Sequence, residues 1–71
     1  MKCAVIIEKG STSYGATVPD LPGCVAVGET LEEVGSLICQ AIEFHIEGLQ
    51  RDGLPVPPAT TICEYVEAPV A

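Results

Sequence analysis

The sequence predicts an α+β domain in which three short strands, one amphipathic helix and a fourth strand follow one another, in the order β-β-β-α-β. Two observations carry this prediction. Apolar residues lie in short, β-branched runs up to residue 28 and then repeat with the period of a helix from Leu31 onward. Turn-forming residues separate the runs. We therefore expect one four-stranded sheet with a single helix on one face.

The first three strands are expected over residues 2–8, 14–18 and 24–28. A polar segment at 9–13 that contains glycine joins the first two as a hairpin. The first and third strands carry apolar residues on both faces, so each needs cover on both sides. Because the connections are short, the three strands should form an antiparallel meander.

The connection between the second and third strands has strong turn chemistry. Pro19 lacks an N–H and ends the second strand. The segment 21–24 fits a type II turn, since Pro22 fixes φ at the first central position and Gly23 accepts the positive φ at the second. We assign structural roles to Pro22 and Gly23, and also to Gly28 at the end of the third strand.

The helix is predicted from its two ends inward. Thr30 and Glu33 form a capping box, in which the Thr30 hydroxyl accepts from the Glu33 amide and the Glu33 carboxylate reaches back to the Thr30 amide. Apolar residues then repeat every three or four positions from Leu31 to Leu49. Gly53 suits the position just past the helix, and the Pro-rich segment 55–58 prevents its continuation.

A fourth strand is expected at residues 60–66, which have high β propensity. Its buried face stays open, because Ile62 and Val66 alternate with Cys63 and Tyr65. The chain is read as one domain, residues 1–71, with a core of about 2–66 and a frayed tail at 67–71. No C-terminal DNA-binding domain is expected.

Composition restricts the function. The 71 residues contain ten carboxylates against three Lys and Arg residues, a net charge of −7, which argues against direct nucleic-acid binding and suits a basic protein partner. The hydrophobic fraction of 48% is high for so small a domain. The sheet face opposite the helix should therefore be covered by a second copy, giving a homo-oligomer, or by a partner protein.

The four cysteines, Cys3, Cys24, Cys39 and Cys63, have no spacing typical of a metal site. They are interpreted as small buried hydrophobes of a protein in the reducing cytoplasm. No cofactor or metal is expected, and no targeting or membrane-spanning segment is visible.

Four segments resemble the HicB family of antitoxins: Tyr14, residues 18–24, residues 28–33 and residues 52–57. With the first hairpin, the resemblance covers about residues 3–58. It implies a partial ribonuclease-H-like fold without nuclease activity. It also implies a noncatalytic protein that neutralises a small basic HicA toxin, an mRNA ribonuclease, by covering its active surface. Many members carry a further DNA-binding domain, which is not expected here.

The residues proposed to contact a partner are Pro19, Asp20 and Leu21 in the turn, and Glu43 and Glu47 on the exposed helix face. For the turn residues, a purely structural role is the alternative, because turn geometry already demands the Pro and Gly. For the two helical glutamates, the alternative is a solvated surface.

Three alternatives to this function rest on particular residues or on the fold. Asp20, Glu29 and Glu33 could form a carboxylate cluster for Mg²⁺ and make the chain a metal-dependent nuclease, but turn and cap chemistry account for them more simply. His45 lies at the margin of the apolar helix face without a residue placed to form a catalytic dyad. An orphan homodimer of the same fold, without a toxin, is the remaining alternative.

Overall fold

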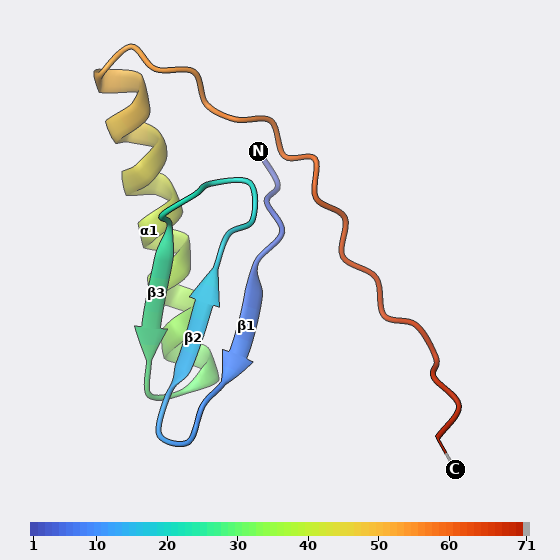
Figure 1. Cartoon of the computed structure of the whole chain (residues 1–71). Helices are drawn as coiled ribbons and strands as arrows, with labels where there is room; N and C mark the ends of the chain where they lie inside the picture. Colours follow the sequence, from blue (N-terminus) through green and yellow to red (C-terminus); the bar gives the residue numbers. More distant parts are fainter. Residues whose placement is uncertain (71) are drawn as a thin grey trace.

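The computed structural model describes residues 1–70 and contains a three-stranded antiparallel sheet with one long helix on one face (Figure 1). The strands are β1 (Ile6–Lys9), β2 (Tyr14–Thr17) and β3 (Val25–Gly28), in the order β1-β2-β3. The helix α1 spans Leu31–Arg51. The predicted α+β class and antiparallel meander are confirmed. The predicted fourth strand is wrong for the single chain, because residues 60–66 lie outside the sheet.

Small residues let the helix approach the sheet. Ile7, Ala16 and Ala26 are paired across the three strands and share the face that points toward α1. At Gly28 a Cβ atom would lie 2.8 Å from the backbone nitrogen of Val34, so the first turn of the helix can pack here only against glycine. Gly28 thus fixes how closely β3 and α1 approach each other.

The buried core lies on one side of the sheet. It is formed by β2, the turn that follows it and the first half of α1, and its members are Ala16, Val18, Leu21, Cys24, Val34 and Ile38. The helix packs on β3 and β2 and not on β1. All four residues of β1 are therefore exposed, and the first strand begins at Ile6 instead of residue 2. Among the described residues, the helix does not provide the cover that was expected for this strand.

The connection between β2 and β3 is built from two successive turns. The Leu21 amide donates to the Val18 carbonyl at 3.1 Å, and the Cys24 amide donates to the Leu21 carbonyl at 3.0 Å. Gly23 has φ of 85°, which confirms the type II turn. The two turns direct the Leu21 side chain inward, where it is 0% exposed. Leu21 is a core residue, and its side chain has no surface to offer a partner.

The N-terminus of α1 is capped almost as predicted. Thr30 is the N-cap, and its hydroxyl accepts from the Glu33 amide at 3.0 Å. The Glu33 carboxylate accepts from the Glu29 amide at 3.3 Å, not from the Thr30 amide. The reciprocal bond is therefore shifted by one residue, because the extended backbone before the helix brings the Glu29 amide within reach.

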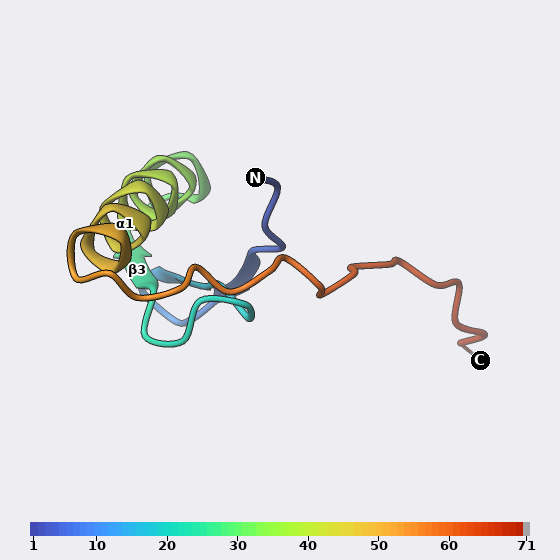
Figure 2. The same ribbon diagram turned by 90° about the horizontal axis from the view of Figure 1, so that it is seen from above.

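Beyond the helix the chain reverses and crosses the molecule. Gly53 has φ of 69°, and its amide donates to the Gln50 carbonyl at 3.1 Å, which ends the helix as predicted. Val56 and Pro57 are half-buried, and residues 60–70, here termed the C-terminal arm, are extended and exposed. Figures 1 and 2 show this arm passing the N-terminal segment and then leaving the body of the protein.

The cysteines fall into two groups. Cys24 is buried and Cys3 is half-buried, whereas Cys39 and Cys63 are exposed, and all four thiols are free. The expectation that all four are buried is wrong for Cys39, which lies on the solvent side of α1, and for Cys63, which lies in the C-terminal arm. Their exposure follows from position, since neither residue faces the sheet.

Candidate interaction surface

The outer face of the sheet, opposite α1, is apolar and uncovered. Ile6, Thr17 and Val25 are paired in one row across this face, and Val27 lies in the next row. Val25 is 60% exposed and Val27 is 66% exposed. Apolar strand residues that face solvent on one side of a sheet are typical of a surface that another chain covers.

The helix presents a second surface, on the side away from the sheet. Glu43 and Glu47 are exposed and lie opposite the buried residues Val34 and Ile38 on the helical period. Phe44 lies next to these glutamates and is 73% exposed. We call Glu43, Phe44 and Glu47 the acidic helix face. It combines an exposed aromatic ring with two negative charges.

Asp20 holds the start of the C-terminal arm. Its carboxylate accepts from the Thr61 hydroxyl at 2.8 Å, from the Thr61 amide at 3.1 Å and from the Thr60 hydroxyl at 3.3 Å. These bonds, those from Thr61 first, lower the pKa of Asp20 from its ordinary value because they stabilise the ionised form. We call this arrangement the latch. It connects the turn after β2 with the chain beyond the helix.

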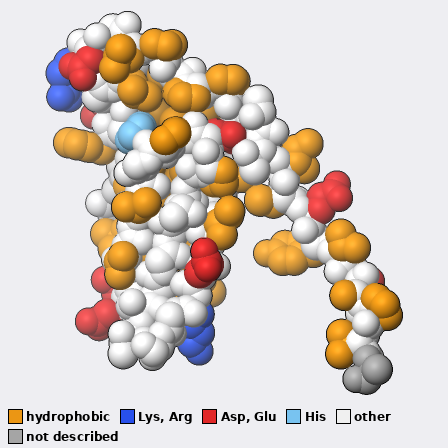
Figure 3. Space-filling view, viewed as in Figure 1, with side chains coloured by type: hydrophobic (Ala, Val, Ile, Leu, Met, Phe, Trp, Pro, Cys, Tyr) orange, Lys and Arg blue, Asp and Glu red, His pale blue; other side chains and the backbone are white. Residues whose placement is uncertain are grey.

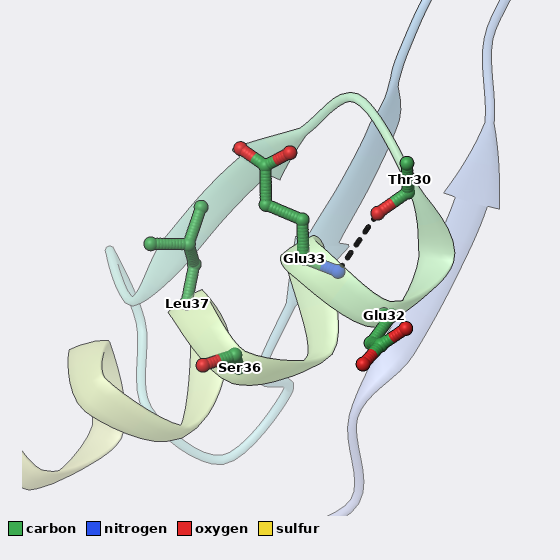
Figure 4. A pocket seen from close by; sticks show the side chains of 5 residues that line it. All are labelled: Thr30, Glu32, Glu33, Ser36 and Leu37. Carbon is green, nitrogen blue, oxygen red and sulfur yellow. Dashed lines mark hydrogen bonds between the residues drawn. The ribbon is translucent and has the colours of Figure 1, made fainter.

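A shallow pocket of about 350 Å³ lies at the N-terminus of α1, as Figure 4 shows. It is lined by residues of the N-cap and the first two turns: Thr30, Glu32, Glu33, Ser36 and Leu37. The Thr30 hydroxyl and the Glu33 carboxylate already take part in capping. Glu32 and Glu33 also compensate the positive end of the helix dipole. The pocket is thus a consequence of how the helix begins.

The three carboxylates considered for Mg²⁺ are not brought together. Asp20 lies in the turn before β3, whereas Glu29 and Glu33 follow β3, so the length of the strand separates them. Within residues 1–70, no group of three or more His, Cys, Asp or Glu residues is placed to hold a metal ion. His45 is half-buried on α1. The geometry removes the basis for the carboxylate cluster.

The remaining predicted contact residues occupy different places. Pro19 is exposed in the first of the two turns, and Asp20 beside it is half-buried and accepts the hydrogen bonds of the latch. Glu43 and Glu47 lie on the acidic helix face. Sequence reasoning missed Phe44. It could have been found as an aromatic residue on the side of the helix where the pattern predicts polar residues. Sequence reasoning also missed the bonds of Asp20, which join segments that no local pattern relates.

Nearly all of the described chain matches a protein family. The family model for a HicB_like antitoxin of bacterial toxin-antitoxin systems aligns with residues 3–70. The chain belongs to the HicB-like antitoxin family. The match extends beyond the resemblance seen at residues 3–58 and includes the C-terminal arm. The arm is therefore part of the family's domain and not an appendage to it.

Several curated proteins are similar to this HicB-like chain. An uncharacterised 14.9 kDa protein from the rep-hol intergenic region of Haemophilus phage HP1 is 40% identical over 65 residues, which is 92% of this chain and 49% of the phage protein. A UPF0150 protein of Helicobacter pylori is 43% identical over 49 residues, 69% of this chain and 68% of that protein. A UPF0150 protein of Synechocystis is 43% identical over 54 residues, which is 75% of this chain and 68% of that protein.

The chain thus spans about half the length of the phage relative. No solved structure matches the chain. Of residues 1–70, none belongs to a helix that is long and apolar enough to cross a membrane.

Proposed function

We propose that this HicB-like chain is an antitoxin subunit that neutralises a small, basic HicA-type mRNA ribonuclease by covering its RNA-binding surface. The observation that carries the proposal is the family match over residues 3–70. The chain acts by binding and not by catalysis. Its partner is a protein, it does not itself bind nucleic acid, and it works in the cytoplasm, where mRNA is cleaved. Its sheet is proposed to belong to a partial ribonuclease-H-like fold.

Charge supports the choice of partner. The chain carries ten carboxylates against three Lys and Arg residues. A ribonuclease that binds mRNA needs Lys and Arg residues to neutralise the phosphates, so its RNA-binding surface is positively charged. An acidic surface of opposite sign accelerates encounter with such a protein and disfavours binding to RNA. The antitoxin then occupies the surface that the RNA would occupy.

The acidic helix face is the part of the molecule best suited to this contact. Glu43 and Glu47 are exposed on the same side of α1, and Phe44 beside them is largely exposed. Exposed aromatic residues are common anchors of interfaces, and carboxylates around them can pair with Lys and Arg. Pro19, which is exposed in the turn, remains a second proposed contact. Asp20 contributes through the latch, and Leu21 shapes the turn from inside.

The proposal is tested with the product of a small basic reading frame adjacent to the gene. We expect co-purification of the two proteins and suppression of mRNA cleavage by the pure antitoxin chain. The double substitution Glu43→Lys with Glu47→Lys should weaken the complex at least about tenfold, because two attractive charges become repulsive. Binding is measured by calorimetry at two salt concentrations.

The matched control is Glu8→Lys with Glu29→Lys, which changes the net charge equally at exposed positions away from the acidic helix face. An equal loss in the control would show that only overall charge matters and would remove the assignment of this surface. No complex and no protection of mRNA would remove the antitoxin proposal itself and leave an orphan oligomer.

A further inference from the structure

A groove separates β1 from the C-terminal arm. It has a volume of about 380 Å³ and is lined on one side by Val5, Ile6 and Ile7 and on the other by residues 62–65. Both walls carry apolar side chains, and Glu64 is a charged member of the arm wall. The groove lies beside the strand that α1 leaves uncovered, so it marks the place where the sheet of a single chain is incomplete.

The backbone groups on the two sides of this groove, those of β1 and those of the arm, do not pair with each other. β1 is at the end of the sheet and, among residues 1–70, pairs only with β2, so its other edge is open there. In the part of the chain that the structure describes, the backbone of residues 62–70 makes no hydrogen bond to β1. An open strand edge and an extended segment without partners are complementary, because each offers the N–H and C=O groups that the other lacks.

The arm is far more apolar than a solvated tail. Ile62 is 82% exposed, Tyr65 is fully exposed, and Val66 and Val70 are almost as accessible. Figure 3 shows hydrophobic side chains along the whole arm, with few acidic side chains among them. Alternate residues of an extended segment point to opposite sides, so the arm can bury apolar groups on a strand edge and on the adjoining sheet face.

The latch fixes the place where the arm starts. Asp20 holds Thr60 and Thr61, residues 62–65 then face β1 across the groove without pairing with it, and beyond them the arm leaves the body of the molecule (Figures 1 and 2). The protein measures 52 × 27 × 15 Å because of this projection. Nine extended residues span about 30 Å, more than twice the length of a four-residue strand. The arm is thus long enough to reach and cover the open edge of another molecule.

Charge favours a second copy of this chain as that molecule. Two of the three basic residues lie near this edge, since Lys2 precedes β1 and Lys9 is its last residue. The arm carries Glu64 and Glu67. An arm aligned with the β1 edge of a second copy brings these opposite charges close. Every copy also has both an arm and an open strand edge. In a dimer with two-fold symmetry, the arm of each copy can therefore pair with the open edge of the other.

We propose that two copies exchange C-terminal arms, so that residues 62–70 of each pair with the open edge of β1 in the other. The apolar side chains of the arm then fill the groove beside Val5 and Ile7. The four-stranded sheet expected from the sequence is completed by the second copy. This inference concerns assembly of the chain with itself and does not depend on the identity of any toxin.

Disulfide trapping tests the exchange in the full-length chain. One protein carries Cys3→Ser, Cys39→Ser and Cys63→Ser with Ile6→Cys, and so presents a thiol only on β1 besides the buried Cys24. A second protein carries Cys3→Ser and Cys39→Ser and presents Cys63 on the arm. After mixing and mild oxidation, arm exchange predicts a β1-to-arm linked heterodimer, identified by its mass under non-reducing denaturing conditions.

A single chain that carries both Ile6→Cys and Cys63 separates exchange from folding back. Exchange gives a covalent dimer at low concentration. A monomer with an internal disulfide would show that the arm returns to its own β1 and would overturn the proposal. Absence of any β1-to-arm disulfide in either format would overturn it equally.

Sedimentation equilibrium of the unmodified chain supplies the second measurement. We expect a dimer. Glu64→Pro removes an N–H from the centre of the arm and should weaken dimerisation at least about tenfold, whereas Glu64→Gln keeps the N–H and should not. Residue 64 is exposed in the single chain, so neither change disturbs its fold. A monomeric unmodified protein, or a dimer indifferent to Glu64→Pro, would contradict arm exchange.

Discussion

Two segments of this protein that carry apolar residues differ in burial: the turn at residues 18–24 and the C-terminal arm. The turn at residues 18–24 contains two prolines, a glycine and an aspartate, yet it delivers Leu21 to the centre of the core. The C-terminal arm has high β propensity and several large hydrophobic residues, yet it lies almost entirely in solvent. Local composition therefore does not decide burial here. What decides it is whether the same chain supplies a surface for the segment to pack against.

The largest expected difference is between Leu21 and Ile62. Leu21→Ala should lower the free energy of unfolding by about 2–5 kcal/mol, because it leaves a cavity at a fully buried position. Ile62→Ala should change it by no more than about 0.5 kcal/mol in a monomer, because the side chain is exposed. Urea denaturation of dilute protein measures both. Similar losses would show that the arm is already packed in the single chain.

The contrast also explains what the sequence could predict. The helix, its Thr30 cap and its end at Gly53 depend on residues a few positions apart, so their patterns are complete within a short window. The type II turn at Gly23 is local in the same sense. The fourth strand predicted at residues 60–66 depends on more than local sequence. A strand needs a neighbour, and propensity does not say which edge provides it.

The surface residues were harder to predict for a related reason. Leu21 resembles a surface residue because prolines lie close to it on both sides, although it is the only leucine within the turn. Asp20 suited turn chemistry, whereas its side chain bonds to Thr61 from a remote segment. Neither outcome follows from spacing. Both depend on how the chain after the helix crosses the turn.

Two glycines allow a second comparison, between a position in close contact with a neighbouring element and a position with free space. Gly28→Ala should destabilise the fold by about 1–3 kcal/mol, because the new Cβ would lie 2.8 Å from the Val34 nitrogen. Gly35→Ala places its Cβ in open space on the same helix and should stabilise by up to about 1 kcal/mol. Thermal unfolding distinguishes the two signs. A neutral Gly28→Ala would mean that α1 does not pack closely on β3.

The latch should depend on pH, since it needs the ionised carboxylate of Asp20. Its pKa lies below the ordinary value of 3.8 because Thr61 and Thr60 donate hydrogen bonds to it. The contribution of the latch is therefore fully present above 3.8 and is lost as pH falls through the lowered pKa. We expect the amide proton shift of Thr61 to titrate with a midpoint below 3.8.

Asp20→Asn provides the control for this titration, because it removes the ionisable group while keeping a similar shape. The Thr61 amide shift should then be independent of pH in the same range. A midpoint at or above the ordinary value in the unmodified chain would show that the arm is not held by this carboxylate.

The smallest expected effect is on thiol chemistry, and it leaves stability unchanged. Cys39 and Cys63 are exposed, whereas Cys24 is buried, and burial, with a further effect from nearby Cys3, raises the pKa of the Cys24 thiol. Because the thiolate is the reactive form, a thiol-specific reagent at neutral pH should modify Cys39 and Cys63 first and Cys24 last. Mass spectrometry of the modified peptides gives the order. If arms are exchanged, Cys63 should react more slowly than Cys39 at high protein concentration and equally fast in Glu64→Pro, since only pairing of the arm covers that position.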